Sequence, residues 1–312
     1  MKKSKFIRID YSVLSSSVGR SATVIVFALI VALALGALFL EEDDMAHVPI
    51  AIGVCALDSA RSWVALGSLA DFAREKGVGD ITWRYLDADA SPAGCDFYLM
   101  TSIQGAPYIA DGSLECALIA TVRQGVRYAR GGVVARSGMD LEALNGGAVI
   151  FTSPISAAGY LSPYEALGGA GYGGGSTRFE FVGPYMSEEA VVFGVLFGAY
   201  EAGGIGLERL DYLEQLGIVP GGALTVLLEG DPMPEMIIAV ETTVEPRKRH
   251  GFCERLPLIL EKMPRFLEAD LAGIGISGFV SPRQEDAALL ESISDWINDH
   301  PVSPEDPHRY IR

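Results

Sequence analysis

The sequence predicts an α/β protein of two lobes, preceded by one apolar segment long enough to cross a membrane. Three observations support this prediction. Short apolar runs of strand length alternate with segments of helical spacing, this alternation occurs in two successive sets, and only residues 21–40 form an uncharged apolar run of about twenty residues. The roughly 265 residues that follow exceed the usual size of one domain, so we expect two lobes rather than one.

The N-terminal part has the charge pattern of a membrane-inserted segment. Residues 1–20 form a basic segment with five Lys or Arg and one Asp, and residues 41–44 are all acidic. The positive-inside rule therefore keeps residues 1–20 in the cytoplasm and places the body outside the cytoplasmic membrane, on the periplasmic or extracellular face. Residues 21–40 are long enough for a transmembrane anchor, and the alternative is a signal segment cleaved near residues 32–34.

Charge limits the partners of the exported part. The chain carries a net charge of −16, and its basic N-terminal segment leaves the remainder still more acidic. Such a surface argues against binding to nucleic acid or to anionic lipid headgroups. It does not exclude a small anion held by local dipoles or a few basic side chains.

Metal, cofactor and catalytic signatures are missing from the sequence. The four cysteines include no C-x-x-C pair, and their disulfide pairing stays open among three arrangements: Cys55, Cys95, Cys116 and Cys253. The histidines show no metal-ligand spacing, and there is neither a G-x-S-x-G nor an H-E-x-x-H motif. We therefore expect no catalytic residues, no metal and no cofactor.

The first set of elements begins after the acidic tether. Strands are predicted at residues 48–56, 81–86, 97–101 and 115–121, and helical spacing covers residues 61–76. The second set has strands at 133–135, 148–151, 178–182 and 224–228, and helices at 140–144, 157–167 and 188–200. A strand at 236–240 and helices at 252–267 and 285–296 close the chain. This alternation predicts mostly parallel sheets.

The stretch FTSPISAAGYLSP at residues 151–163 is the clearest binding signal. Thr152, Ser153 and Ser156 stand between a strand and the start of a helix. Small hydroxyl residues there satisfy the first backbone N–H groups, which together with the helix dipole can also hold an oxyanion. An ordinary helix cap without a ligand explains the same residues.

Several stretches resemble the phosphonate-binding periplasmic proteins of ABC transporters, and they occur in the order of that family. They are residues 96–112, 126–147, 151–163, 181–206, 227–240 and 275–280. The resemblance implies a two-lobed type II periplasmic-binding fold that closes on a ligand, with hinges near residues 128–135 and 236–240. It divides the exported chain into the first part of lobe 1 at 46–130, lobe 2 at 131–235, and a return to lobe 1 with C-terminal helices at 236–312.

Residue positions at strand ends and helix starts, together with the resemblance, suggest a set of ligand-binding residues. They are Thr101, Ser102, Tyr108, Thr152, Ser153, Ser156, Tyr185, Glu201 and Asp231. Where the family has Ser-Thr-Ser-Gly, this chain has Ser-Ala-Ala-Gly at 156–159, which removes two hydroxyls and weakens a phosphonate site. Tyr185 stands where relatives often have histidine. Capping, packing or surface roles are the alternatives for each residue.

The function that the resemblance implies is solute binding, not catalysis. The protein is expected to bind a phosphonate, phosphate or related small oxyanion and to deliver it to the permease of an ABC importer. The alternative is a membrane-anchored sensory or accessory protein of the same fold that binds another ligand or none and acts on a membrane partner.

Overall fold

The structure, a computed structural model, describes residues 47–55, 57, 59–87, 91–172, 177–182 and 188–300. Within these ranges no helix combines the length and the apolarity needed to cross a membrane. The anchor or signal segment predicted at residues 21–40 lies outside the described residues, so it stays a prediction.

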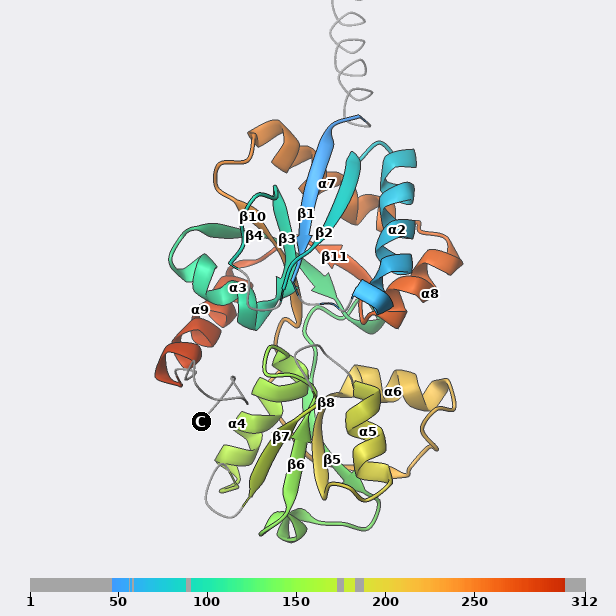
Figure 1. Cartoon of the computed structure of the whole chain (residues 1–312), viewed down its shortest axis with the longest axis vertical. Helices are drawn as coiled ribbons and strands as arrows, with labels where there is room; N and C mark the ends of the chain where they lie inside the picture. The colour runs from blue at the N-terminus through green and yellow to red at the C-terminus, as the bar shows by residue number, and fades with distance from the viewer. Residues whose placement is uncertain are drawn as a thin grey trace, which may run out of the picture.

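Two sheets define two lobes, one above the other in Figure 1. The sheet of lobe 1 has the strand order β11-β4-β10-β3-β1-β2. Its strands are β1 (Pro49–Val54), β2 (Asp80–Tyr85), β3 (Phe97–Thr101), β4 (Leu114–Thr121), β10 (Met236–Glu241) and β11 (Gly278–Val280). The sheet of lobe 2 has the order β7-β6-β8-β5-β9. Its strands are β5 (Gly131–Arg136), β6 (Ala148–Phe151), β7 (Arg178–Phe181), β8 (Ala202–Gly206) and β9 (Leu224–Glu229).

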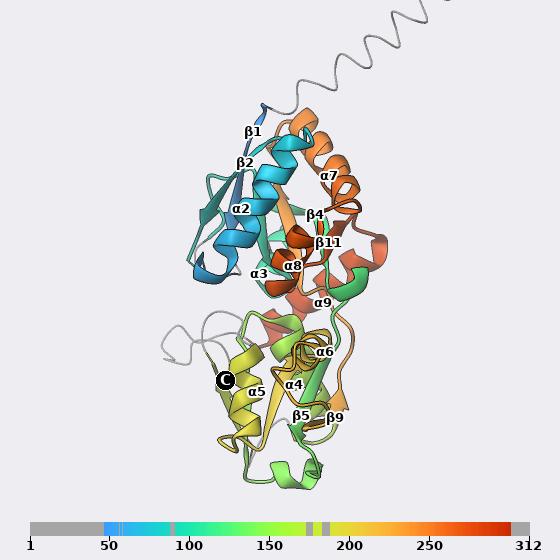
Figure 2. The same ribbon diagram turned by 90° about the vertical axis from the view of Figure 1, so that its right-hand side faces the viewer.

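Helices cover both faces of each sheet, as the two views in Figures 1 and 2 show. In lobe 1, α2 (Ser59–Glu75), α7 (Pro246–Leu260) and α8 (Arg265–Gly273) share one hydrophobic core, and α3 (Ser102–Ala110) and α9 (Gln284–Asp299) share the other. In lobe 2, α5 (Glu188–Leu196) and α6 (Leu207–Gln215) pack on one face, and α4 (Ser162–Gly169) packs on the other. The short helices are η3 (Arg123–Gly125), η4 (Leu141–Leu144) and the π-helix η5 (Ala157–Leu161).

The two crossings between the lobes explain why the sheets are mixed. The chain leaves lobe 1 after β4 and enters lobe 2 at β5, and it returns after β9 to enter lobe 1 at β10. Strand β5 runs antiparallel to β8 and β9, and β10 runs antiparallel to β3 and β4. Each of these two strands comes from the other lobe. It therefore begins at the end of the sheet where its parallel neighbours finish, and it runs in the opposite direction to them. The sheets are otherwise parallel at β1, β2 and β3 and at β6, β7 and β8.

Most predicted elements form, and the differences have local causes. The helix predicted at residues 252–267 is two helices, because the chain turns after α7 and α8 starts directly after Pro264, which has extended backbone angles. Strand β8 escapes prediction because its sequence, AGGIG, has few side chains to show a pattern. The return crossing, at residues 230–235, precedes the segment 236–240 where the resemblance suggested a hinge, since that segment lies inside β10.

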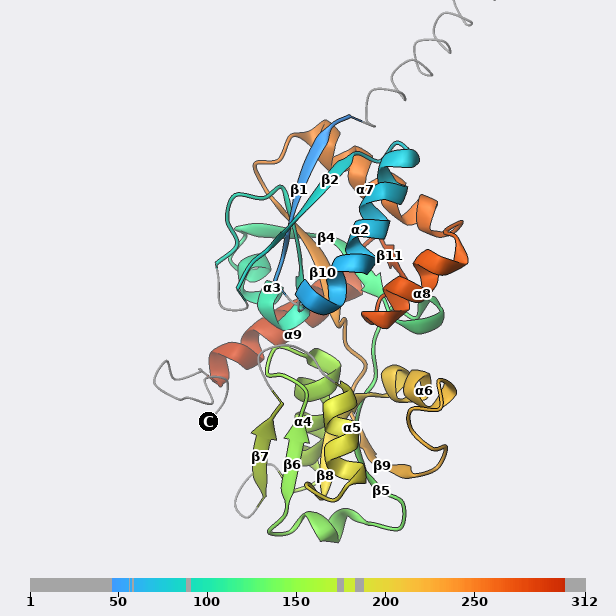
Figure 3. The same ribbon diagram turned by 45° about the vertical axis from the view of Figure 1, so that its right-hand side comes forward.

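Helix α9 joins the outward crossing to both lobes (Figure 3). Asp286, whose side chain is 1% exposed, accepts hydrogen bonds from Arg127 Nη1 at 2.6 Å and from Tyr128 Oη at 2.8 Å. At the other end of the helix, the ring of Trp296 lies 6.1 Å from that of Tyr160 and 6.2 Å from that of Tyr164 in lobe 2. The helix therefore fixes the crossing to lobe 1 and also contacts lobe 2.

The four cysteines are all free in the structure. The pKa of the Cys55 thiol and that of the Cys116 thiol are each raised to about 12, mainly because these thiols are shielded from water. Cys95 is buried as well, and Cys253 is partly buried. Buried thiols with raised pKa values react slowly as nucleophiles.

We predict that Asp286→Asn destabilises the protein by about 2 kcal/mol, because the partly buried Arg127 then loses its charged partner. Urea unfolding of the purified chain measures this loss. Glu285→Gln is the matched control: Glu285 is the neighbouring exposed carboxylate, 3.2 Å from Arg283 Nη1, and its loss should cost about 0.5 kcal/mol or less. Equal destabilisation by the two variants would contradict the role given to Asp286.

Candidate ligand cavity between the lobes

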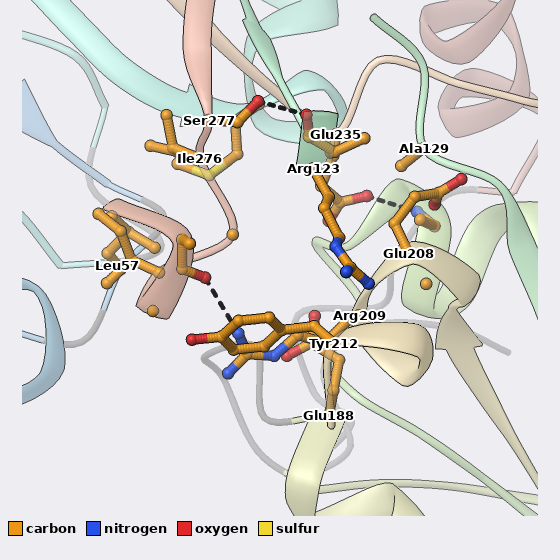
Figure 4. Close-up of a pocket in the computed structure, with 18 of the residues that line it drawn as sticks. Leu57, Arg123, Ala129, Glu188, Glu208, Arg209, Tyr212, Glu235, Ile276 and Ser277 are labelled. Carbon is orange, nitrogen blue, oxygen red and sulfur yellow. Dashed lines mark hydrogen bonds between the residues drawn. The ribbon is translucent and has the colours of Figure 1, made fainter. Parts of the chain in front are cut away.

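A cavity of about 120 Å³ lies between the two lobes. Lobe 1 contributes Leu57, Val122, Met236 and residues 272–277, and lobe 2 contributes residues from η5, α5, β8 and α6. The wall is mainly apolar, with charged side chains at a few positions that Figure 4 shows: Arg123, Glu188, Glu208, Arg209 and Glu235. A concave, mainly apolar space with a few polar groups, located between two lobes, is the usual form of a small-ligand site.

Two arginines connect the lobes across this cavity. Arg209 of α6 donates from Nη1 to the carbonyl oxygen of Ala272 in α8 at 3.2 Å, and from Nη2 to Glu189 at 2.6 Å. Arg123, which follows β4 in lobe 1, donates to the side-chain oxygen of Gln215 in α6. The Nε of Arg209 is buried without a hydrogen-bond partner among the described residues. The structure thus has both lobes in direct contact at the cavity, with one donor unused.

The start of the helix after Phe151 is occupied by a side chain of the protein itself. Glu235, in the return crossing, accepts a hydrogen bond from Ser156 Oγ at 2.8 Å through one carboxyl oxygen and from the backbone N of Ala158 at 2.5 Å through the other. Figure 4 shows Glu235 at the cavity wall. We call Ser156 Oγ and Ala158 N the cradle. The sequence predicts that an oxyanion from outside binds at this position, and in the structure a carboxylate of the chain lies there.

Burial is the main cause that raises the pKa of Glu235 to about 7, and the nearby Glu188 carboxylate adds to the effect. The hydrogen bonds from Ala158 and Ser156 act in the opposite direction and stabilise the charged form. No arginine or lysine forms an ion pair with Glu235 in the part of the chain that the structure describes. A carboxyl group with this pKa changes its charge near neutral pH.

Unused hydroxyl groups lie close to the cradle. Ser156 caps η5 and accepts from the backbone N of Gly159 at 2.8 Å. A Cβ atom on Gly159 would lie 2.2 Å from Thr152 Oγ1, so this hydroxyl lies directly against the first helical turn. Both Thr152 Oγ1 and Ser102 Oγ are buried and have no partner among the described residues. Buried hydroxyls without partners are costly and are typical of sites that bind something polar.

The sequence profile of the periplasmic substrate-binding proteins of phosphonate ABC transporters matches residues 96–287, more than half of the chain. The chain belongs to this family. The members of the family are solute-binding proteins of transporters and not enzymes. No curated protein sequence is similar enough to the chain to be matched.

Solved structures with low sequence identity share the fold. XAC2383 from Xanthomonas citri, bound to ATP, is 16% identical with a TM-score of 0.59, and the match covers 80% of this chain and 97% of that one. A binding protein component of an ABC phosphonate transporter from Pseudomonas aeruginosa is 13% identical, with a TM-score of 0.58 and coverage of 83% and 91%. PhnD1 from Prochlorococcus marinus, in complex with methylphosphonate, is 14% identical, with a TM-score of 0.57 and coverage of 80% and 98%.

Five of the suggested residues lie in or beside the cradle, although none of them forms the cavity wall. They are Thr101, Ser102, Thr152, Ser153 and Ser156, all buried. Thr101 caps α3 and faces Met236 across the sheet, and the N of Ser102 donates to the backbone oxygen of Glu235 at 3.0 Å. These residues therefore help to hold the backbone of Glu235 and the start of helix η5 in place, without lining the cavity themselves.

Three other suggested residues lie away from the cavity. Glu201 precedes β8, at the opposite end of the strand from the cavity, and accepts from Ala148 N at 2.6 Å. Tyr108 lies in the second turn of α3, beside Leu114, and Asp231 is exposed in the return crossing. The resemblance suggested Glu201 and Asp231, and Tyr108 was suggested by its place after the end of a strand, but in the structure none of the three lines the cavity. Tyr185 lies outside the described residues.

Sequence patterns do not indicate the charged residues that line the cavity. Glu235 and Arg123 stand in connecting segments between strands, and Glu188, Glu208 and Arg209 stand in the first turns of helices, where charged residues are ordinarily solvated. The one available signal was for Glu235, an acidic residue directly before the predicted return strand. Among the described residues no cluster of three or more His, Cys, Asp or Glu is placed to hold a metal ion.

We predict that Glu235→Gln removes a pH-dependent loss of stability. The pKa of Glu235 is about 7 in the folded protein against an ordinary value of 4.5, so the folded state retains a proton that the unfolded state loses between these pH values. The wild-type free energy of unfolding should therefore fall, relative to that of Glu235→Gln, by about 3 kcal/mol from pH 4.5 to pH 8. Urea unfolding at several pH values measures the difference. Glu229→Gln, a change at an exposed carboxylate, should follow the wild type, and parallel curves for wild type and Glu235→Gln would contradict the assignment.

We predict that Gly159→Ala costs at least about 2 kcal/mol, because the added methyl group would overlap Thr152 Oγ1 and Ser156 Oγ. Gly168→Ala is the matched control, since nothing lies within 4 Å of the Cβ position of Gly168 in the following helix α4. That change should be neutral or stabilise the protein by up to about 1 kcal/mol. Thermal unfolding of both variants provides the comparison, and a tolerated Gly159→Ala would show that the cradle adapts easily.

Proposed function

We propose that this member of the phosphonate substrate-binding family binds a small phosphonate-type oxyanion in the cavity between its lobes and delivers it to the permease of an ABC importer by lobe closure. The observation that carries the proposal is the cavity itself, which both lobes build and which adjoins the amide-rich start of a helix. Helix η5 continues directly into α4, so residues 157–169 act as one dipole directed at the cavity.

The size and charge of the cavity favour a small anion with few atoms. A volume of about 120 Å³ is well below the roughly 300 Å³ at which pockets for drug-sized ligands begin. Arg123 and Arg209 are the basic residues of the described wall, and Arg209 has its Nε unused. Methylphosphonate, the ligand of the similarly folded Prochlorococcus protein, matches this size and charge.

The contacts of Arg209 support lobe closure as the mechanism. This residue belongs to lobe 2, but it hydrogen-bonds a carbonyl oxygen of lobe 1 at the cavity wall. A ligand that accepts a hydrogen bond from Arg209 would favour the arrangement in which the lobes touch, and its differential affinity for that arrangement would drive closure.

The second candidate is a sensory or accessory protein with the same fold that acts on a membrane partner and binds another ligand or none. The specific observation in its favour is the Glu235 carboxylate in the cradle. A site that is satisfied by the chain itself has less need of an external anion. Binding experiments separate the two candidates.

We predict that methylphosphonate binds to the purified full-length chain in calorimetric titration and raises its thermal unfolding temperature. Arg209→Gln should weaken binding at least tenfold, because it removes a charged donor from the cavity wall. Arg265→Gln, at an exposed position outside the cavity at the start of α8, should leave the affinity unchanged. Absence of heat and of thermal stabilisation with methylphosphonate, phosphate, phosphite and methanesulfonate would favour the second candidate.

A further inference from the structure

Glu235 interacts with the cradle in the way a bound oxyanion would. Its two carboxyl oxygens each accept one hydrogen bond, from the hydroxyl of Ser156 and from the N–H of Ala158, at the positive end of the helix dipole. The second independent sign of a ligand is the buried, unpartnered Thr152 Oγ1 beside the same helical turn. Thr152 Oγ1 is a hydroxyl beside the cradle that Glu235 does not satisfy, and an oxyanion with three oxygens has one more acceptor to offer.

The backbone of Glu235 keeps its side chain near the cradle. The carbonyl oxygen of Glu235 accepts from Ser102 N, and Met236 begins strand β10 opposite Thr101. If an external anion takes the cradle, the carboxyl group of Glu235 can therefore turn only within the cavity. It then lies beside the anion in a space of about 120 Å³.

The other charged groups around Glu235 do not relieve this conflict. Glu188 of α5 adds negative charge to the same wall, whereas the carboxylate of Glu208 in α6 is paired with Arg130, whose Nε lies 2.9 Å away. Tyr212 is a neutral donor, and Arg123 and Arg209 already donate to Gln215 and to Glu189 and Ala272, respectively. Two negative groups in contact, in a poorly hydrated space, strongly favour protonation of one of them.

We propose that Glu235 is a built-in anion that fills the oxyanion cradle in the free protein, and that an external oxyanion binds there together with one proton, which converts Glu235 into a neutral hydrogen-bond donor to that oxyanion. This inference rests on the proposed function and adds to it a linkage between binding and pH. No bond other than that to the proton is formed or broken: the solvent supplies the proton, and Glu235 returns it when the anion leaves.

The affinity for an oxyanion should fall as the pH rises, by an amount that the pKa of Glu235 sets. With the pKa of Glu235 at about 7, the protonated share of this residue falls about thirtyfold between pH 6 and pH 8.5. The affinity for an oxyanion should fall by the same factor. Glutamine at position 235 is permanently neutral and has both an acceptor for Ala158 N and a donor for the anion, so it should bind the oxyanion with no such loss.

The test is calorimetric titration of methylphosphonate into the wild-type full-length chain and into Glu235→Gln at pH 6, 7 and 8.5. The ratio of the two Kd values cancels the ionisation of the ligand itself. We expect the ratio of wild type to variant to rise about thirtyfold from pH 6 to pH 8.5, and titrations in buffers of different ionisation enthalpy to show proton uptake near pH 8 by the wild type alone. Glu229→Gln should behave as the wild type does.

A constant Kd ratio, or a wild-type affinity that rises with pH relative to the variant, would overturn the inference while leaving methylphosphonate binding in place. If neither protein binds any of the oxyanions in solution, the proposed function fails, and a structural test still decides the inference. Crystals of wild type and of Glu235→Ala are soaked in selenate at pH 8, and the anomalous signal locates the anion.

We expect selenate between Ser156 Oγ and Ala158 N in Glu235→Ala, and the Glu235 carboxylate in that place in the wild type. An empty cradle in Glu235→Ala would overturn the inference, because the helix start would then have no affinity for an anion once the carboxylate is gone. Selenate in the cradle of the wild type at pH 8 would overturn it as well, because Glu235 would then give way without a proton.

Discussion

The contact between Glu235 and the start of the η5 helix connects the two lobes through a single residue. The backbone oxygen of Glu235 is held by Ser102 of lobe 1, and its carboxylate is held by Ser156 and Ala158 of lobe 2. Any change in the charge or position of this carboxylate therefore changes the link between the lobes. Burying an unpaired carboxylate is unfavourable, and the two hydrogen bonds and the helix dipole compensate for that cost only in part, because the pKa remains raised.

Topology explains why such a residue exists at this position. Strands β6 and β8 end at the cavity, and β10 begins there, since it enters lobe 1 from the return crossing. A helix that follows β6 must then present its first N–H groups to the cavity, and the residue that precedes β10 must pass within reach of them. The same topology therefore lets this chain place one of its own carboxylates at the start of the helix.

Sequence patterns predicted the parts of the molecule that depend on local periodicity. The bounds of β3 and β6 match the predicted strands, and the helix after Phe151 begins at Ala157 as expected. Strand β8 could not be predicted because its glycines allow close packing: a Cβ on Gly203 or Gly204 would lie 2.4 Å from a side-chain atom of Val191 or Phe151. Glycines give no alternation of apolar and polar side chains from which a strand could be predicted. The close packing around β8 nevertheless requires them.

The candidate site was predictable in part for the same reason. Ser156 is recognisable from its neighbours, because a hydroxyl before a helix is a local pattern. Its partner Glu235 is 79 residues away, and nothing in the surrounding sequence distinguishes it from a solvated acidic residue such as Asp231. Only the fold brings Ser156 and Glu235 together. The local pattern at Ser156 could therefore indicate the cradle, but it could not indicate which group occupies it.

An acidic protein that binds an anion depends on short-range interactions. The net charge of −16 is screened over about 8 Å at physiological ionic strength, so it slows the approach of an anion more than it weakens binding inside the cavity. At contact distance, the decisive groups are the first N–H of the helix, the two arginines and the carboxylates of the wall. Since Glu208 is paired with Arg130 while Glu235 has no basic partner among the described residues, a proton on Glu235 would remove the negative charge that lies nearest a bound oxyanion.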